Sequence, residues 1–226
     1  PIGNLDDISL RAIDVIKSAD FIYTEDTRSF KKILDSIECK KKCKSFHEHN
    51  EDIICKEIIK HLKNKKHVIL TCEAGTPAIS DPGYKLIREC LNLNLKYTLI
   101  PGPSSLINAV VLSGLPTDKF SFYGFIPKKS NAQKKLFQKV SNDEKTAIMF
   151  ESVKRLRKTI ISISKHLDNN RHIAVCREMT KIHEQIVQGN CEDLLKKIDC
   201  GSLPLKGEIV LVIEGNTTNN LSLIHI

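Results

Sequence analysis

Thr71-Cys72-Glu73-Ala74-Gly75-Thr76-Pro77-Ala78-Ile79-Ser80-Asp81-Pro82-Gly83 is the stretch that decides the fold of this chain. It follows the short apolar run at residues 67–70, which is typical of a buried parallel strand, and it precedes a run with helical spacing of apolar residues. In open α/β sheets, ligands bind at loops that leave the carboxyl ends of strands. Gly75 has no Cβ, so a ligand can approach its main chain closely. The stretch therefore predicts a ligand-binding loop, with a shaped turn that binds nothing as the alternative.

The same alternation of strand, polar loop and helix recurs through the first half of the chain. Strands are predicted near residues 21–23, 44–46 and 95–100, in addition to 67–70. The loops that follow them contain Glu25-Asp26-Thr27-Arg28, His47-Glu48-His49-Asn50-Glu51 and Pro101-Gly102-Pro103-Ser104-Ser105. If the sheet is parallel, all these loops lie at one edge of it. Ser104 or Ser105 is placed to cap the helix that follows.

The pattern breaks at Ser113–Asp118, which predicts a domain boundary. We expect an N-terminal α/β domain over residues 1–115, with a parallel sheet that carries the substrate and cofactor loops. A C-terminal α/β domain with a mixed sheet is expected over residues 116–226. Its strands are predicted near residues 120–125, 146–150, 173–176 and 208–214.

The composition limits the class of protein. With 41% hydrophobic and 27% charged residues among 226, the chain is typical of a globular soluble protein. No apolar run reaches the roughly 20 residues that span a bilayer, so no membrane association is expected. The eight cysteines include no C-x-x-C pair, which favours reduced thiols in a cytoplasmic protein. The net charge of +8 favours a polyanionic partner such as RNA. Only 5% of residues are aromatic and none is Trp, which argues against a base-stacking platform.

Several common chemistries have no motif in this sequence. The dinucleotide, P-loop, nucleophile-elbow and zincin signatures are all absent. Cys39, Cys43, His47 and His49 have a C-x3-C-x3-H-x-H spacing with zinc-type ligands, but this is not a standard finger. Free cysteines and no metal are the preferred interpretation.

Taken in order, the loop motifs resemble a known family. The motifs that carry the resemblance are Pro1-Ile2-Gly3-Asn4, Glu25-Asp26-Thr27-Arg28, His47-Glu48-His49-Asn50-Glu51, Ala74-Gly75-Thr76-Pro77 with Ile79-Ser80-Asp81-Pro82-Gly83, Pro101-Gly102-Pro103-Ser104, Ser113-Gly114-Leu115-Pro116, Arg177-Glu178-Met179-Thr180-Lys181 and Gly207-Glu208-Ile209-Val210. Together they are similar to the bacterial ribosomal RNA small subunit methyltransferase I family, within the tetrapyrrole methylase (class III) superfamily. The similarity extends from Pro1 to about Gly215.

The resemblance implies two α/β domains of tetrapyrrole methylase type, with S-adenosyl-L-methionine in the cleft between them. It also implies a cytoplasmic homodimer that methylates the 2′-hydroxyl of a cytidine ribose in the decoding region of 16S ribosomal RNA, within the 30S subunit. Two departures stand out. The family has Ser-Asp where this chain has Cys72-Glu73, and the first strand of the N-terminal domain is expected to be missing before Pro1.

A ribose hydroxyl is a poor nucleophile, so its methylation benefits from a general base. Glu25, Asp26 and His47, at strand ends, are the catalytic candidates. Arg28 could anchor an RNA phosphate, although an Asp26–Arg28 pair that only caps a helix is the alternative. By resemblance, the substrate-binding set is Asn4, Arg28, His49, Asn50 and Arg177. The cofactor-binding set is Gly75, Thr76, Pro77, Ile79, Ser104, Ser105, Thr180 and Glu184.

Two rival functions remain open at this point. A methylase that acts on a precorrin or another tetrapyrrole would share the fold. A catalytically inactive RNA-binding protein would keep the basic surface without the reaction.

Overall fold

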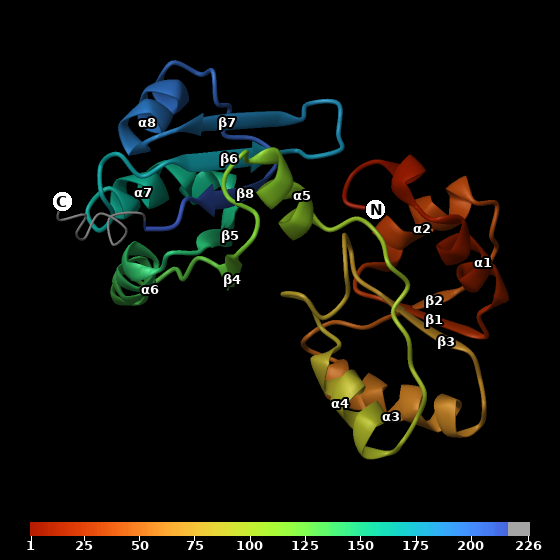
Figure 1. Cartoon of the computed structure of the whole chain (residues 1–226). Helices are drawn as coiled ribbons and strands as arrows, with labels where there is room; N and C mark the ends of the chain where they lie inside the picture. The colour runs from red at the N-terminus through yellow and green to blue at the C-terminus, as the bar shows by residue number, and fades with distance from the viewer. Residues whose placement is uncertain (217–226) are drawn as a thin grey trace. The chain divides into compact units, whose positions relative to one another are not determined.

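The computed structural model describes residues 1–216, which form two compact units. The first unit is Pro1–Ser104 and the second begins at Ser105 (Figure 1). The boundary predicted after residue 115 lies beyond helix α5 (Ser105–Leu112), and this helix groups with the second unit. Among residues 1–216, no helix is both long enough and apolar enough to cross a membrane.

The first unit is built around a small parallel sheet. Its elements are the 3-10 helix η1 (Leu5–Asp7), α1 (Leu10–Ser18), β1 (Phe21–Thr24), α2 (Thr27–Ser36), β2 (Cys43–Ser45), α3 (Glu51–Lys63), β3 (Val68–Thr71) and α4 (Tyr84–Asn92). The strand order is β2-β1-β3, and both pairings are parallel. All three carboxyl ends therefore lie at one edge of the sheet, as predicted.

Side chains alternate between the two faces of this sheet and form two cores. Ile22 of β1 packs with α1 and α2, in a cluster that includes Ile16, Phe30 and Leu34. Tyr23, the next residue, packs on the other face with α3 and α4. The helices thus cover both faces of the sheet, which is the usual arrangement for parallel strands.

The prediction of a strand at residues 95–100 is wrong. The chain from α4 to α5 has no helix or strand and is drawn as a coil in Figure 1. A strand requires a neighbour that supplies backbone hydrogen bonds. Within the described residues, β3 pairs only with β1, and no strand extends the sheet on its other edge. Leu95 packs against the core of α3 and α4, but Leu99 is 58% exposed and the segment pairs with no strand among the described residues.

The second unit contains a mixed sheet, as predicted, but the sheet has five strands in the described residues where four were predicted. Its elements after α5 are β4 (Phe120–Phe125), α6 (Ser130–Asn142), β5 (Thr146–Ser152), α7 (Val153–Ile163), β6 (Ile173–Arg177), β7 (Gln185–Gly189), α8 (Cys191–Asp199) and β8 (Glu208–Ile213). The order is β4-β5-β8-β6-β7, with β4 parallel to β5 and the other pairings antiparallel.

The two faces of this sheet have different covers. Ala147 and Met149 of β5 join a core cluster with side chains from α6, α7 and α8. Residues between them in sequence lie on the opposite face, because side chains alternate along a strand. That face is packed by α5, whose Ala109 and Val110 are buried. The Cys176 thiol of β6 also lies 3.6 Å from the Ala109 carbonyl oxygen, so α5 is an integral part of the second unit.

Candidate active site

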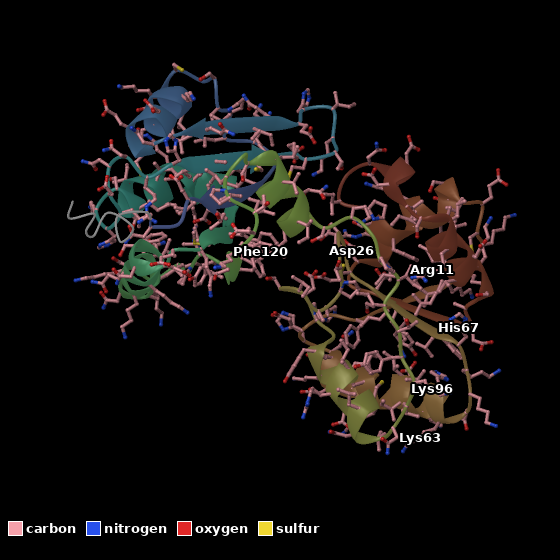
Figure 2. The ribbon with its side chains drawn as sticks, viewed as in Figure 1. Arg11, Asp26, Lys63, His67, Lys96 and Phe120 are labelled. Carbon is pink, nitrogen blue, oxygen red and sulfur yellow. The ribbon has the colours of Figure 1, made fainter. Side chains whose placement is uncertain are left out.

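The candidate site lies at the carboxyl edge of the first unit's sheet. Residues 25–26 follow β1, residues 46–50 follow β2 and residues 72–83 follow β3. Figure 2 labels Asp26 at this edge and His67, just before β3, at the opposite end of the strands. The parallel pairing thus brings the predicted loops together within one unit.

The loop after β3 has an unusual backbone. Two residues other than Gly, Ala78 and Ser80, have positive φ angles of 67° and 62°, and Gly75 has a φ of 82°. Such conformations cost free energy in residues with a Cβ and persist only where the surroundings impose them. They concentrate at functional sites more often than elsewhere. The backbone of this loop therefore marks it as a candidate functional site.

Gly75 connects three of the predicted motifs. Its backbone N–H donates to the Pro1 carbonyl oxygen at 3.1 Å. A Cβ added to Gly75 would lie 3.6 Å from Ile2 Cγ2 and 3.9 Å from the Pro103 carbonyl oxygen. Ile2 is buried. The first residues, the loop after β3 and the segment before α5 therefore meet at Gly75.

The predicted cofactor residues that follow Gly75 lie along this loop. Thr76 and Pro77 are half-buried, and Ile79 is 44% exposed. Ser104 ends the first unit, and α5 begins at Ser105, where the sequence predicted a helix start. Of these residues, Thr76, Pro77 and Ile79 share one loop with Gly75.

Glu51 fixes the far end of the same loop. Its carboxylate Oε1 accepts the Gly83 backbone N–H at 3.0 Å, and Gly83 has a φ of 131°. Lys85 lies 3.7 Å from Glu51 Oε2. Glu51 is only 8% exposed, so the loop is tied to the first turn of α3 by a buried, charge-assisted hydrogen bond. Glu51 lies in a motif noted in the sequence, but no role was predicted for it.

Asp81 is a carboxyl group of this loop whose pKa is shifted upward. Burial, and next the charge of Glu25, raise the pKa of Asp81 to about 6. Glu73 acts in the same direction more weakly. Burial also raises the pKa of the Cys72 thiol to about 12, so the thiol stays protonated and donates to the Ala74 carbonyl oxygen at 3.3 Å. Three carboxyl groups thus influence one another where β1 and β3 end.

Asp81 was not selected from the sequence. The signal that could have found it is its place in the loop after β3, because loops that follow neighbouring parallel strands such as β1 and β3 lie at the same edge of a sheet. Glu73, in the same loop, accepts a hydrogen bond from the Ser29 hydroxyl at 3.3 Å.

Asp26 forms the capping pair that the sequence left as an alternative. Its Oδ1 accepts the Arg28 backbone N–H at 2.8 Å at the start of α2, and its Oδ2 lies 2.9 Å from Arg28 Nη2. Hydrogen bonds from Arg28 lower the pKa of Asp26 to about 2. Both carboxylate oxygens are therefore occupied by Arg28.

The loop after β2 is held by Asn50. Its Oδ1 accepts the His47 backbone N–H at 2.8 Å, and its side-chain nitrogen donates to the Ser45 carbonyl oxygen at 3.1 Å. The rings of His47 and His49 meet edge to face, with centroids 5.8 Å apart. The Nδ1 atom of His47 is buried and has no hydrogen-bond partner among residues 1–216. Asn50 therefore shapes the loop that presents His47.

Two threonine hydroxyl groups lie at the carboxyl ends of β1 and β3, where these loops begin. Thr24 and Thr71 are the last residues of β1 and β3 and lie directly opposite each other in the register. Thr24 is fully buried, and the Oγ1 atoms of both residues lack a hydrogen-bond partner within the described chain. Buried hydroxyl groups are rarely left unpaired, so these two are available to a bound ligand. Neither threonine was among the residues predicted from the sequence.

The remaining predicted residues have defined contacts within their own units. The Asn4 side chain accepts the Asp6 backbone N–H at 3.1 Å in η1. In the second unit, the Arg177 guanidinium donates to the Gln185 side chain and to the carbonyl oxygens of Lys206 and His183. The Thr180 backbone N–H donates to the Glu184 carboxylate at 2.7 Å. Their roles toward substrate and cofactor stay predictions.

No group of three or more His, Cys, Asp or Glu side chains within the described range is arranged to hold a metal ion. Cys39 and Cys43 instead pack against the core of α1 and α2.

Comparison with known proteins identifies relatives over nearly the whole chain. The family model described as Tetrapyrrole (Corrin/Porphyrin) Methylases matches residues 1–195. A protein from Rickettsia prowazekii named ribosomal RNA small subunit methyltransferase I is 42% identical over 96% of this chain and 76% of its own length. Proteins of the same name from Hydrogenobaculum sp. (41% identical, 96% of this chain, 94% of the relative) and Thermotoga maritima (38%, 95% and 95%) are also similar.

One solved structure establishes the fold independently of close sequence similarity. The crystal structure of diphthine synthase superposes with a TM-score of 0.70, covering 94% of this chain and 86% of that one, at 15% sequence identity.

Proposed function

The chain belongs to the tetrapyrrole methylase family, and within it to the ribosomal RNA small subunit methyltransferase I family, so we propose that it methylates ribosomal RNA of the small subunit with S-adenosyl-L-methionine as the methyl donor. The observation that carries this proposal is the 41% identity to the Hydrogenobaculum relative over 96% of the chain and 94% of the relative. The net charge of +8 supports a polyanionic substrate.

The finer assignment follows the family resemblance. We propose that the acceptor is the 2′-hydroxyl of a cytidine in the decoding region of 16S RNA, within the 30S subunit. The protein acts as a homodimer in the cytoplasm.

The residues at the carboxyl edge of the first sheet suit this cofactor. S-adenosyl-L-methionine carries a positive sulfonium and an ammonium group, and Glu25, Glu73 and Asp81 supply complementary negative charge. The unpaired hydroxyl groups of Thr24 and Thr71 offer it hydrogen bonds. Gly75, Thr76, Pro77 and Ile79 form the loop that would hold it, while Ser104, Ser105, Thr180 and Glu184 remain predicted cofactor residues. When bound, the cofactor would supply its methyl group to the ribose oxygen in an in-line displacement, in which an O–C bond forms, the S–C bond breaks and S-adenosyl-L-homocysteine leaves.

Asp81 is the best candidate to accept the proton of the ribose hydroxyl. A general base works best when its pKa lies near the working pH. The pKa of about 6 leaves Asp81 mostly ionised at pH 7, yet more basic than an ordinary carboxylate. Glu25 holds that pKa up by its charge and is the alternative base. Asp26 is a weaker candidate, because its pKa is about 2 and Arg28 occupies both oxygens. His47 would contact the substrate through Nδ1.

Arg28, His49 and Asn50 are the proposed RNA contacts of the first unit. The Arg28 side chain is 90% exposed even though it pairs with Asp26, so it can also reach a phosphate. Asn50 also shapes the loop that carries the two histidines.

A labelling experiment tests the proposal against its rivals. Purified protein is incubated with tritiated S-adenosyl-L-methionine and either 30S subunits or a precorrin. Label in the RNA is the expected result. Label in the precorrin would instead favour the corrin or porphyrin chemistry for which the family is named. RNA binding with no label in either acceptor would indicate an inactive RNA-binding protein.

A further inference from the structure

The second unit carries an exposed aromatic ring beside two unpaired lysines, and the first unit's site does not explain this arrangement. The ring belongs to Phe125, the last residue of β4, which is 62% exposed. Lys128 and Lys129 follow it in the loop before α6, and both are exposed. We call Phe125, Lys128 and Lys129 the β4 surface.

A bulge in β4 sets the position of the Phe125 ring. Phe122 pairs with Ile148 and Phe125 with Phe150, so β4 has one more residue than β5 between these pairs. Gly124, within the bulge, has a φ of 66°, which favours glycine. Without the extra residue, Phe122 and Phe125 would point to opposite faces of the sheet. The bulge instead places both rings against Phe150.

Phe150 supports the exposed ring from behind. The Phe125 and Phe150 centroids are 5.3 Å apart with planes at 63°, and the Phe122 and Phe150 centroids are 4.9 Å apart at 65°. These are edge-to-face contacts, a favoured geometry for aromatic pairs. Figure 2 labels Phe120 on the same strand, which is the edge strand of the sheet.

The loop that carries the lysines is held rigidly. The Ile126 N–H donates to the Phe150 carbonyl oxygen at 3.0 Å, and Arg155 donates to the Ile126 carbonyl oxygen at 2.6 Å. The Gln133 side chain donates to the Pro127 carbonyl oxygen at 2.8 Å.

A buried carboxylate orients Arg155 in turn. Glu151, only 5% exposed, pairs with Arg155 at 2.8 Å and accepts the Thr159 hydroxyl at 2.5 Å. These hydrogen bonds within the second unit thus hold the backbone of the loop without a bound partner.

The two lysines of this loop, Lys128 and Lys129, form no ion pair within the part of the chain that the structure describes. Two exposed lysines that follow an exposed ring by three and four residues complement a nucleotide, which has a negative phosphate and a base with a π face. A single ring differs from the platform of several rings that the composition disfavours.

We propose that the β4 surface binds an unpaired nucleotide of the RNA substrate, with its base stacked on Phe125 and its neighbouring phosphates at Lys128 and Lys129. This inference rests on the proposed function, because it takes the substrate to be RNA. The β4 surface belongs to the second unit, and the role proposed for it is to bind the substrate rather than to take part in methyl transfer.

The test compares Phe125→Ala and the double variant Lys128→Ala/Lys129→Ala with a matched control, Lys158→Ala/Lys165→Ala. The control lysines are exposed and lie in and just after α7, which packs on the other face of the sheet. The probes are a short fluorescein-labelled single-stranded RNA and 30S subunits, each measured over a range of salt concentrations. S-adenosyl-L-methionine affinity is measured in parallel by calorimetry.

Phe125→Ala should raise the RNA dissociation constant about 5- to 150-fold, the range for losing one stacked base. Phe125→Tyr should restore most of the affinity. Lys128→Ala/Lys129→Ala should reduce the slope of log K against log salt by about 1.4, which corresponds to two single-strand phosphates. The affinity for S-adenosyl-L-methionine should not change in any variant.

Two results would overturn the inference while leaving the proposed function intact. In the first, the wild-type protein transfers methyl groups to RNA, but both variants bind RNA with the same affinity as the control. The second is loss of self-association in Phe125→Ala with unchanged RNA affinity, which would make the β4 surface a contact between two copies of the chain. Conversely, the variants could lose RNA affinity as predicted while the wild-type protein transfers no methyl group. That outcome would contradict only the proposed reaction.

Discussion

Glu51 and Gly83 are joined by a buried hydrogen bond in which the Gly83 N–H donates to the Glu51 carboxylate at 3.0 Å. The bond connects the first turn of α3 with the end of the loop after β3, just where α4 begins. A carboxylate near a helix N-terminus is favourable in itself. Glu51 therefore acts as a positioning residue, because it holds the loop that carries Gly75 and Asp81.

The first prediction concerns this bond. Glu51→Ala should lower the free energy of unfolding by about 1–3 kcal/mol, because it leaves a buried N–H without a partner. It should also weaken S-adenosyl-L-methionine binding. Urea denaturation and calorimetry measure the two effects.

The neighbouring Asp52 supplies the control for Glu51. It is exposed and pairs with the same Lys85 at 2.7 Å, so Asp52→Ala should lower the stability much less than Glu51→Ala, because exposed ion pairs contribute little. Equal losses in the two variants would contradict the special role of Glu51.

The second prediction separates backbone strain from ligand contact at Gly75. Gly75→Ala and Gly201→Ala introduce a Cβ at nearly the same φ, 82° and 79°. Both should therefore lose about 1–2 kcal/mol of stability. Only Gly75→Ala should weaken S-adenosyl-L-methionine binding, since Gly201 lies in the turn after α8 with open space around it. Parallel losses of affinity in both variants would remove the loop from the cofactor site.

The third prediction concerns pH. Because Asp81 is the proposed base and its pKa is about 6, the rate of methyl transfer should rise with pH through about 6 and level off above it. Asp81→Asn should lower kcat by roughly 10²–10⁴-fold. The pH profile and the kcat of the variant test this directly. A profile with no inflection near pH 6, or an active Asp81→Asn variant, would exclude Asp81 as the base.

The raised pKa of Asp81 also predicts how stability depends on pH. The dependence has the opposite sign to that of most acidic residues, whose pKa is lowered on folding. Its pKa is raised on folding, so the native state favours the protonated form. The stability that it contributes is complete below its unfolded pKa, near 4, and is lost as the pH rises through about 6. Asp81→Asn should therefore be more stable than wild type at pH 7.5 and similar to it near pH 4. Urea midpoints at the two pH values decide the question.

Glu25 offers a further test of the coupled carboxyl groups. Its charge raises the pKa of Asp81, second only to burial. Glu25→Gln should therefore shift the acidic limb of the pH–rate profile to lower pH while the enzyme stays active. An inactive Glu25→Gln variant would instead make Glu25 the base and leave Asp81 a secondary role.

The open edge of β3 gives a prediction about the first sheet. Within the described residues β3 pairs with β1 alone, and Pro1 is bonded to Gly75 beside it. An apolar strand of about five residues added before Pro1 should raise the urea midpoint, since each fully buried large apolar side chain contributes roughly 1.5–3 kcal/mol. Unchanged midpoints would mean that the sheet is complete as it stands.

The order of loops was predictable because Gly, Pro and polar residues mark the strand ends. The strand expected at residues 95–100 shows the limit of this reasoning. Its apolar residues fit the pattern, but a strand also needs a partner, which local sequence does not reveal. Strand β7 was missed for a related reason, because its five residues are defined mainly by pairing with β6.

The site was predictable as a set of loops but not as chemistry. The pKa of Asp81 depends on burial and on Glu25, which is distant in sequence, so no local motif reveals it. The unpaired Thr24 and Thr71 hydroxyl groups likewise become visible only when the register of β1 and β3 is known. The Asp26–Arg28 pair is local, and the sequence did anticipate it as an alternative.

One measurement tests the central claim most directly. Unmodified 30S subunits are incubated with the protein and S-adenosyl-L-methionine, and the 16S RNA is digested to nucleosides for mass spectrometry, with Asp81→Asn as the inactive control. We predict that 2′-O-methylcytidine accumulates with wild-type protein and not with the variant. RNA that gains no methylated nucleoside, from a protein that binds S-adenosyl-L-methionine, would contradict the account.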